Sequence, residues 1–285
     1  MKKHLKNWRV LFLVVLIVFN LFVWSGVNAL KPKKHVTVSF INVGQGDSIL
    51  IESSNNNHIL IDGGRDKKLL YELGKTLSFF EREIDVVIET HPDADHIGGL
   101  PEVIKRYKVG LFMEPGVESE NAIDDELKRR VKEKNIADTL ARAGQVIDLG
   151  DGSYLRILFP DRDVSGLDTN DASVVAQYIY GDTCFHLTGD SPIKIENYLI
   201  EIYGKKLKCN VLKTGHHGSR TSTREEYVVT VQPEIAIISA GKDNSYGHPH
   251  SEVVERLKNH NVKILSTIDS GTIKLISDGE KIWQK

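Results

Sequence analysis

The chain is poor in cysteine and nearly neutral, and each shortage excludes a class of protein. Cys184 and Cys209 are the only cysteines among 285 residues, and they form neither a CxxC zinc pair nor the dense spacing of a disulfide scaffold. They lie in separate apolar segments, so we expect two small buried side chains, with one disulfide as the alternative. The formal net charge is −2, which excludes an overall basic surface that attracts nucleic acid or an anionic membrane over long range.

Two further features are missing. No segment interleaves aromatic and basic side chains in the manner of proteins that stack nucleic-acid bases. No serine or cysteine has a convincing base partner for nucleophilic catalysis. The composition, 40% hydrophobic and 27% charged, is ordinary for a globular protein with one large or two small domains. The chemistry is therefore sought among histidines and carboxylates.

The N-terminal segment differs from the rest of the chain. Residues 1–9 (MKKHLKNWR) carry basic side chains and no acid, and no charge follows Arg9 until Lys31. This pattern predicts a signal peptide or an N-terminal membrane anchor over residues 1–30, a linker over 31–35 and one domain over 36–285. Small residues near Ala29 are compatible with cleavage, so both fates stay open. We expect the domain to be secreted or held on the outer face of the cytoplasmic membrane, which it contacts only through this segment.

Short strands and helices alternate after the linker. A strand meander followed by strand–helix alternation occurs twice, which favours two sheets packed face to face with helices on both outer sides. The predicted strands are 36–40, 48–53, 58–64, 84–90, 109–116, 145–150, 154–159, 173–180, 183–190, 209–215, 234–241, 262–267 and 272–277. The predicted helices are 67–80, 100–107, 121–143, 192–203, 223–231 and 251–260.

Polar residues are concentrated in five clusters, four of which directly follow a predicted strand. Loops at strand ends carry function on a rigid base, so we expect these clusters to converge on one rim of the sandwich. The clusters are Asp62-Gly63-Gly64, His91 to His96, Gly189-Asp190, His216 to Ser219, and Asn244 to His250.

The segment HPDADH packs four potential metal ligands into six residues. In a tight turn such ligands divide between two faces, so His91 and Asp93 would hold one ion and Asp95 and His96 a second. Imidazole and carboxylate donors suit zinc, manganese or iron. The alternative is a solvated turn with helix-capping aspartates, but capping requires one acid and not four ligands.

The later clusters offer further ligands. Asp190 precedes Pro192, so it either caps the next helix or bridges two metals, and the presence of HPDADH favours the bridge. One of His216 and His217 is expected to be a ligand or an acid while the other supports it or faces substrate. The alternative is that these loop histidines have no role.

Other polar residues are candidates for contacts with substrate. In the turn NSYGHPH, either His248 or His250 would donate to a leaving group or a phosphate. The residues expected to contact substrate are Lys213, Ser219 and Asn244. Ser219 also fits a helix entry, and Lys213 a solvated charge. The segment GQGD, residues 44–47, opens a strand rather than a helix, so it does not form a phosphate loop. Its glycines instead allow the backbone to pass close beneath the site.

Seven blocks in a fixed order carry a family resemblance. From Phe40 to Pro249 they are FINVGQGDSILI, ILIDGG, THPDADHIGG, NDASVV, LTGD, LKTGHHGS and NSYGHP. In this order they resemble the metallo-β-lactamase superfamily, and in particular the extracytoplasmic hydrolase domain of ComEC-type DNA-uptake proteins. The resemblance implies an α/β (α+β) fold, an αββα four-layer sandwich of two mixed sheets, with a two-metal site on its rim.

The resemblance also implies roles for single residues. Asp190 would bridge a metal held by His91 and Asp93 and a second held by Asp95 and His96, and His216 or His217 would complete the set. The superfamily motif is HxHxDH, so Asp93 replaces an imidazole by an oxygen donor and shifts the preference toward Mn²⁺, with Zn²⁺ still possible. Asn170 stands where the superfamily usually has another histidine. The expected catalytic residues are Asp95, His217 and His248, and the expected structural residues are Asp62, Gly63 and Asn170.

The function implied is hydrolysis of a phosphodiester, with DNA as the expected substrate, by water activated between two divalent ions. A second hypothesis is a phosphodiesterase of cell-wall teichoic acid or phospholipid head groups. A third is an exported metal-binding or nucleic-acid-binding module with little catalysis. No obligate protein partner is evident in the sequence.

Overall fold

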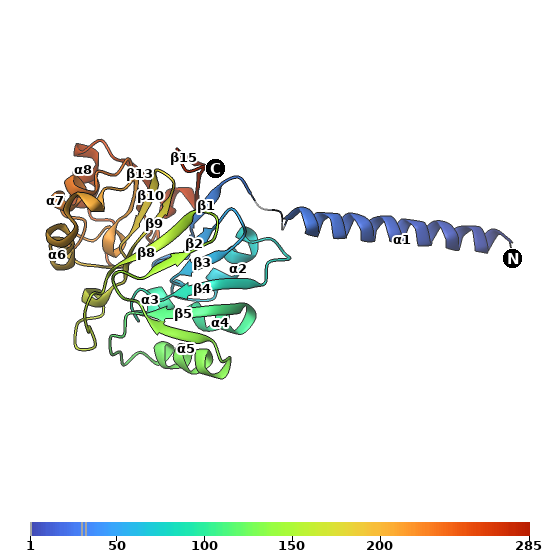
Figure 1. Cartoon of the computed structure of the whole chain (residues 1–285), viewed down its shortest axis with the longest axis horizontal. Coiled ribbons are helices and arrows are strands. Elements are labelled where there is room, and N and C mark those ends of the chain that lie inside the picture. The colour runs from blue at the N-terminus through green and yellow to red at the C-terminus, as the bar shows by residue number, and fades with distance from the viewer. Residues whose placement is uncertain (1, 30, 32) are drawn as a thin grey trace.

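The N-terminal helix projects from the folded body of the protein. The computed structural model describes residues 2–29, 31 and 33–285, with side chains from residue 8 onward except 28 and 29. Helix α1, Lys2–Ala29, extends away from the sheets (Figure 1). Its segment Trp8–Val27 is 20 residues long with a mean hydropathy of 2.7, enough to cross a membrane by length and composition, although a signal sequence meets the same criterion. Whether residues 1–30 are cleaved or retained stays a prediction.

The first sheet is mixed. It contains β1 (Val36–Phe40), β2 (Ile49–Glu52), β3 (His58–Ile61), β4 (Glu83–Ile88), β5 (Lys108–Glu114), β6 (Ala137–Leu140), β14 (Ile273–Ser277) and β15 (Ile282–Gln284). Their order is β15-β14-β1-β2-β3-β4-β5-β6. Neighbours from β3 to β6 are parallel and the other pairs are antiparallel.

The second sheet repeats this plan. It contains β7 (Val146–Asp148), β8 (Ser153–Phe159), β9 (Val175–Tyr180), β10 (Thr183–Leu187), β11 (Val211–Lys213), β12 (Ile235–Ile238) and β13 (Lys263–Ser266). Their order is β13-β12-β11-β10-β9-β8-β7. Strands β7 to β10 pair antiparallel and β10 to β13 pair parallel.

Helices cover the outer face of each sheet, and the predicted αββα sandwich is confirmed. One apolar core, which includes Ile51 and Phe185, lies between the sheets. Helices α2 (Lys68–Thr76), α4 (Leu100–Arg106) and α5 (Ala122–Glu133) pack on the first sheet. Helices α6 (Ile193–Tyr203), α7 (Glu225–Val231) and α8 (Ser251–Asn259) lie on the far side of the second (Figure 1). Short helices α3 (Ala94–Ile97) and α9 (Thr267–Ser270) and the 3₁₀ turns Asn170–Ala172, Gly204–Leu207 and Gly215–Gly218 lie in loops.

The predicted long helix over residues 121–143 is wrong in its second half. Helix α5 ends at Glu133, and β6 follows as an edge strand parallel to β5. The helix stops because Asn135 adopts a left-handed backbone with φ of 52°. Leu140 is 42% exposed and does not continue the apolar stripe of α5. The sequence ADTL of β6 does not alternate apolar and polar residues, so the local pattern does not predict a strand there.

The expectation of two unpaired buried cysteines is also wrong. Cys184 and Cys209 form a disulfide with a Cα–Cα distance of 4.8 Å. Cys184 lies in β10, and Cys209 precedes β11, which pairs parallel to β10 with Phe185 opposite Val211. The sheet register brings the two thiols together, and the bridge closes a loop with a sequence separation of 25.

Removing this disulfide is expected to destabilise the domain. Because the bridge restricts the unfolded chain, the double variant Cys184→Ala/Cys209→Ala should lose about 2–4 kcal/mol of unfolding free energy. The midpoint of urea unfolding measures this loss. Reductant should lower the midpoint of the wild type and leave that of the double variant unchanged. An equal midpoint for reduced and oxidised wild type would contradict the prediction.

Candidate metal centre

Strand ends from both sheets deliver polar side chains to one rim. Asp62 follows β3, and residues 91–96 follow β4, in the first sheet. Asp190 follows β10 and His217 follows β11, in the second sheet. Asp47 lies in the turn before β2. The predicted convergence of the clusters is therefore observed across the interface of the two sheets.

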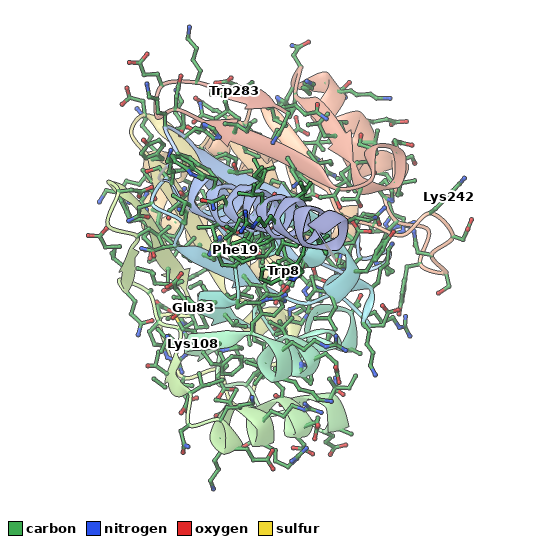
Figure 2. The ribbon with its side chains drawn as sticks, turned by 90° about the vertical axis from the view of Figure 1, so that its right-hand side faces the viewer. Trp8, Phe19, Glu83, Lys108, Lys242 and Trp283 are labelled. Carbon is green, nitrogen blue, oxygen red and sulfur yellow. A yellow bond between two sulfur atoms is a disulfide. The ribbon has the colours of Figure 1, made fainter. Side chains whose placement is uncertain are left out.

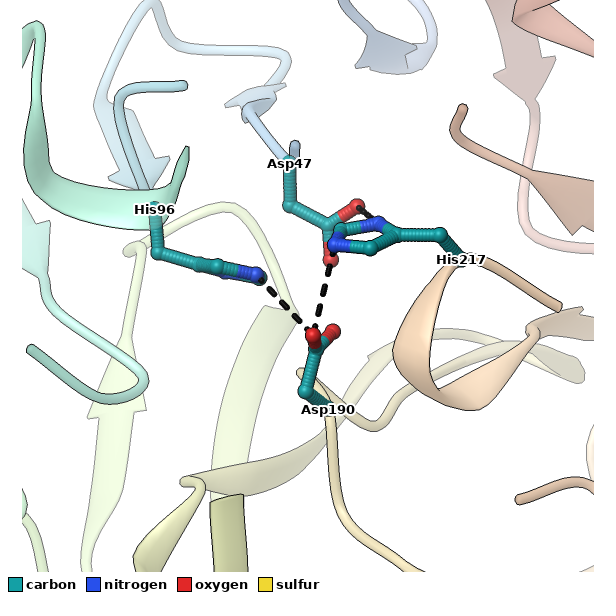
Figure 3. Close-up of side chains that lie close together, drawn as sticks. All are labelled: Asp47, His96, Asp190 and His217. Atoms are coloured by element: carbon teal, nitrogen blue, oxygen red, sulfur yellow. Dashed lines mark ion pairs between the residues drawn. The ribbon is translucent and has the colours of Figure 1, made fainter. Parts of the chain in front are cut away.

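Asp190 lies at the centre of the rim. Its Oδ2 is 3.3 Å from Nε2 of His96 and 3.3 Å from Nε2 of His217 (Figure 3). The same nitrogen of His217 lies 3.4 Å from Oδ2 of Asp95. One ligand atom from each of His96, Asp190, His217 and Asp47 lies within 4.8 Å of the others. Carboxylate and imidazole atoms thus surround a common point.

Hydrogen bonds at Nδ1 leave Nε2 of three histidines of the rim free. His96 donates from Nδ1 to Oδ2 of Asp62 at 2.7 Å, and His217 donates from Nδ1 to the Ser239 carbonyl at 3.0 Å. Nδ1 of His91 lies 3.0 Å from Oγ1 of Thr90, which itself donates to Asp62. Such bonds fix the tautomer in which Nε2 is free to ligate a metal.

Unpaired buried atoms show that these residues fit divalent cations. Nε2 of His91, His96 and His217 and Oδ1 of Asp190 are buried with no hydrogen-bond partner among the described residues. Buried polar atoms in proteins normally have partners, so these unpaired atoms along the rim favour bound ligands. Imidazole nitrogens and carboxylate oxygens are the donors that Zn²⁺ and Mn²⁺ accept.

The electrostatics of the rim also favour a cation. Burial alone would lower the pKa of His96, but the carboxylates of Asp190 and Asp62 outweigh it and raise that pKa well above its ordinary value. His217 shows the same balance with Asp190 and Asp47. Burial would raise the pKa of Asp190, but His217 and His96 hold it well below the ordinary value. The carboxylates thus draw protons onto imidazoles that divalent ions would occupy.

The structure separates two potential metal positions. Asp95, His96, Asp190 and His217 surround the first. At the second, Nε2 of His91 lies 3.6 Å from Oδ2 of Asp93, whose side chain is 39% exposed. The His91 and His96 rings are 4.1 Å apart, so the two positions are adjacent. The second position is more open to solvent than the first.

The adjacent histidines of HHGS have different environments. The side chain of His217 is 1% exposed, whereas that of His216 is 28% exposed with its Nε2 3.8 Å from Asp190. Their φ angles of 47° and 55° are left-handed, which non-glycine residues rarely adopt. This backbone turns one ring into the rim and the other toward solvent, so His217 is the better placed ligand.

Asp62 and Gly63 support the rim from below. Asp62 accepts from the Thr90 amide at 2.8 Å and the Thr90 hydroxyl at 2.7 Å, in addition to His96. A Cβ at Gly63 would lie 2.8 Å from the backbone nitrogen of Leu100, so only glycine fits there. Both residues hold the loop that carries His96.

Replacing Asp62 by asparagine is expected to weaken metal binding by about 10–100-fold. The amide is a weaker acceptor for the His96 ring, which loses basicity and orientation. Competition with a chromophoric chelator measures the dissociation constant. The matched control is Asp278→Asn, which changes an exposed turn aspartate that accepts from the Glu280 and Lys281 amides. Equal dissociation constants for Asp62→Asn and wild type would refute the supporting role.

Sequence reasoning missed Asp47 and misplaced Lys213. Lys213 is fully buried, forms an ion pair with Asp47, and donates to the Gly189 carbonyl at 2.9 Å. The expected contact of Lys213 with a substrate phosphate does not fit this burial. Asp47 Oδ1 also lies 3.4 Å from Nδ1 of His217. The Asp47–Lys213 pair therefore supports the loop that carries His217. The only sequence signal for Asp47 was a single acid between two apolar strands.

Gly46 of GQGD has the expected role, whereas a Cβ at Gly44 would lie 4.0 Å from Nζ of Lys68. Gly46 has a φ of 123°, and a Cβ there would lie 2.0 Å from the carbonyl oxygen of Asp95. The Asp47 amide donates to the same carbonyl at 3.2 Å. The backbone therefore passes directly against the ligand loop.

The remaining predicted residues have mainly local contacts. Asn244 donates to the Gly241 and His248 carbonyls and accepts from the His248 amide, so its side chain holds its own loop. Ser219 accepts from Thr221 within its own turn. Oδ1 of the half-buried Asn170 has no partner among the residues described.

His248 borders the rim. Its ring lies 5.4 Å from that of His216 and 6.2 Å from that of His217. Burial and the neighbouring histidines lower the pKa of His248 to about 4. A neutral imidazole at this place can donate a hydrogen bond but does not supply an imidazolium proton at neutral pH.

The two packed sheets with a histidine–aspartate rim define the metal-dependent hydrolase class of αββα proteins. Residues 41–242 match the family model described as the Metallo-beta-lactamase superfamily. The chain belongs to this family. The resemblance inferred from the sequence motifs is therefore confirmed.

Curated relatives are competence and recombination proteins. "ComE operon protein 3" of Bacillus subtilis is 32% identical over 254 residues, covering 83% of this chain and 32% of that protein. "Competence protein ComA" of Neisseria gonorrhoeae is 30% identical, covering 85% and 32%. "Recombination protein 2" of Haemophilus influenzae is 31% identical, covering 96% and 33%. The chain spans about a third of the length of these relatives.

Solved structures share the fold at low sequence identity. The diiron β-hydroxylase CmlA of Streptomyces venezuelae is 14% identical with a TM-score of 0.57, covering 89% of this chain and 55% of that chain. The metallo hydrolase Igni18 of Ignicoccus hospitalis is 17% identical with a TM-score of 0.52, covering 84% and 98%. These similarities concern the fold alone.

Proposed function

We propose that the chain is an extracytoplasmic, two-metal phosphodiesterase that cleaves DNA. The observation that carries the proposal is the rim itself, where unpaired nitrogens of His96 and His217 converge on Asp190 in a superfamily of metal-dependent hydrolases. The DNA substrate is supported by the similarity to competence and recombination proteins.

The residues of the rim have separate tasks in this reaction. Asp95, His96, Asp190 and His217 would hold one Zn²⁺ or Mn²⁺, and His91, Asp93 and Asp190 the other. When bound, such a pair of ions lowers the pKa of water and neutralises charge that develops on phosphate oxygens. Neutral His248 donates a hydrogen bond to the leaving oxygen. Asp62 and the Asp47–Lys213 pair hold the His96 and His217 rings in place.

Two features support an extracytoplasmic location. Helix α1 is apolar enough to serve as a signal or an anchor. The Cys184–Cys209 disulfide is a second feature, because disulfides persist mainly in oxidising compartments outside the cytoplasm.

Because the net charge is low, a second class of substrate is tested beside DNA. With a formal charge of −2, the protein has no overall basic surface for DNA, so a cell-wall glycerol-phosphate polymer is the alternative. The full-length chain in detergent is incubated with Mn²⁺ or Zn²⁺ and with single-stranded DNA, duplex DNA, teichoic acid or phospholipid vesicles. Release of acid-soluble nucleotides that stops in chelator supports the proposal. Cleavage of the other substrates alone, or metal binding without turnover, overturns it.

A further inference from the structure

A second group of potential ligands lies at the opposite end of the first sheet. Glu52 ends β2, His58 begins β3, and Glu81 lies in the loop between α2 and β4. We name them the Glu52-His58-Glu81 cluster. Their exposed fractions are 5%, 3% and 8%. Strand β3 runs from His58 toward Asp62, so the cluster is separated from the rim by the length of a strand.

The geometry of this cluster matches a metal and not a simple hydrogen-bonded contact. One ligand atom from each residue lies within 4.8 Å of the other two. Nε2 of His58 is 3.7 Å from Oε1 of Glu81, too far for a hydrogen bond. Ligands about 2.1 Å from a tetrahedral zinc lie about 3.4 Å from one another. A cation therefore fits between these atoms with small adjustments.

An unpaired nitrogen points into the cluster. Nε2 of His58 is buried with no hydrogen-bond partner in the described part of the chain. A buried polar atom without a partner costs roughly 1–3 kcal/mol, so the arrangement is expensive unless a ligand fills it. The other contacts of the carboxylates leave room for that ligand. Oε2 of Glu81 accepts from the Ser78 amide at 2.6 Å, and Oε1 of Glu52 pairs with Lys33 at 3.0 Å.

We propose that the Glu52-His58-Glu81 cluster binds a divalent transition metal, with Zn²⁺ as the best match. One imidazole and two carboxylates supply three ligands, and water completes a fourth position. A cavity of about 380 Å³ adjoins His58 and Glu81 and gives access from solvent. Glu83 and Lys108 also line it, and Figure 2 shows both on the face from which α1 projects.

Metal at this position would fasten the loop that holds α1. Phe80, next to Glu81, contacts the ring of Phe22 at a centroid distance of 5.2 Å. A Cβ at Gly26 of α1 would lie 3.3 Å from the Phe80 ring. The metal would join this loop to β2 and β3, so the N-terminal helix would be attached to the sheet through a coordinated segment.

Metal counting on the full-length chain tests the proposal. After loading with Zn²⁺ and dialysis, elemental analysis gives metal per chain for the wild type, His58→Gln, Glu81→Gln and Asp190→Ala. We expect His58→Gln and Glu81→Gln each to bind one equivalent less than the wild type. Asp190→Ala should retain the equivalent held by the cluster, and Asp190→Ala/His58→Gln should lose it.

The controls separate this site from surface binding and from misfolding. His260→Gln removes a partly exposed histidine whose Nε2 lies 3.4 Å from Glu225, and it should leave the metal count unchanged. Glu81→Gln keeps the acceptor for Ser78 and has nearly the same shape as the wild type, so its circular dichroism should be unchanged. Wild-type metal content in both folded variants, His58→Gln and Glu81→Gln, overturns the proposal.

Discussion

Replacing Asp190 by alanine is expected to reduce kcat for the proposed cleavage of DNA by at least about 10³-fold. Asp190 is the carboxylate that both His96 and His217 approach at 3.3 Å, so its loss removes the shared ligand of the two proposed metal positions. Initial rates at saturating Mn²⁺ and DNA measure the effect. Asp190→Asn should show a loss of similar size, because an amide has no negative charge to share between two cations.

The matched control flanks the same strand, at its other end. Asp182 is an exposed aspartate just before β10, whereas Asp190 follows its carboxyl end. Asp182→Asn should keep the wild-type rate. If Asp190→Ala retained more than a tenth of wild-type kcat with normal metal content, a centre built on Asp190 would be untenable.

Chelation is expected to abolish cleavage and to lower thermal stability. An ion that binds only the folded state at about 100 times its dissociation constant stabilises that state by about 2.7 kcal/mol. This stabilisation by metal should increase as pH rises. In the metal-free protein, carboxylates raise the pKa of His96 and His217. Both imidazoles must lose a proton before they bind metal. Melting curves with Mn²⁺ and with chelator, at several pH values, measure the difference.

The melting curves are best measured on the His58→Gln variant. That substitution removes the metal site proposed at the Glu52-His58-Glu81 cluster, so the remaining shift reports on the rim. Adding Asp190→Ala in the same background should then remove most of the shift. Identical melting temperatures with Mn²⁺ and chelator for the His58→Gln variant would refute metal binding at the rim.

The sequence predicted the sandwich because most of its strands are buried and apolar. Strands such as β4, Glu83–Ile88, carry continuous β-branched runs that end in the ligand loop. The edge strand β6 was not predicted, because its residues ADTL are exposed throughout and pair only with β5. The disulfide was left open for a related reason, since the adjacency of β10 and β11 is a property of the sheet and not of the local sequence.

The site was predicted in its residue types but not in its detailed contacts. HPDADH and Asp190 were recognisable from spacing, whereas the choice between His216 and His217 depends on two left-handed backbone angles. The buried pair of Asp47 and Lys213 joins segments far apart in the chain. No local pattern shows that a lysine at the end of an apolar strand turns inward to meet a distant aspartate.

The pairing of β1 with β14 has a consequence for the order of folding. Strand β1 lies between β2 and β14, and Val36 pairs opposite Ser277 in the C-terminal strand. During synthesis, β1 therefore emerges long before its second neighbour, and one edge of its backbone stays unpaired for most of that time. Contacts of such large sequence separation form slowly, and unpaired edges promote association with other chains. The first sheet thus closes late, after the segments that carry both candidate metal sites have left the ribosome.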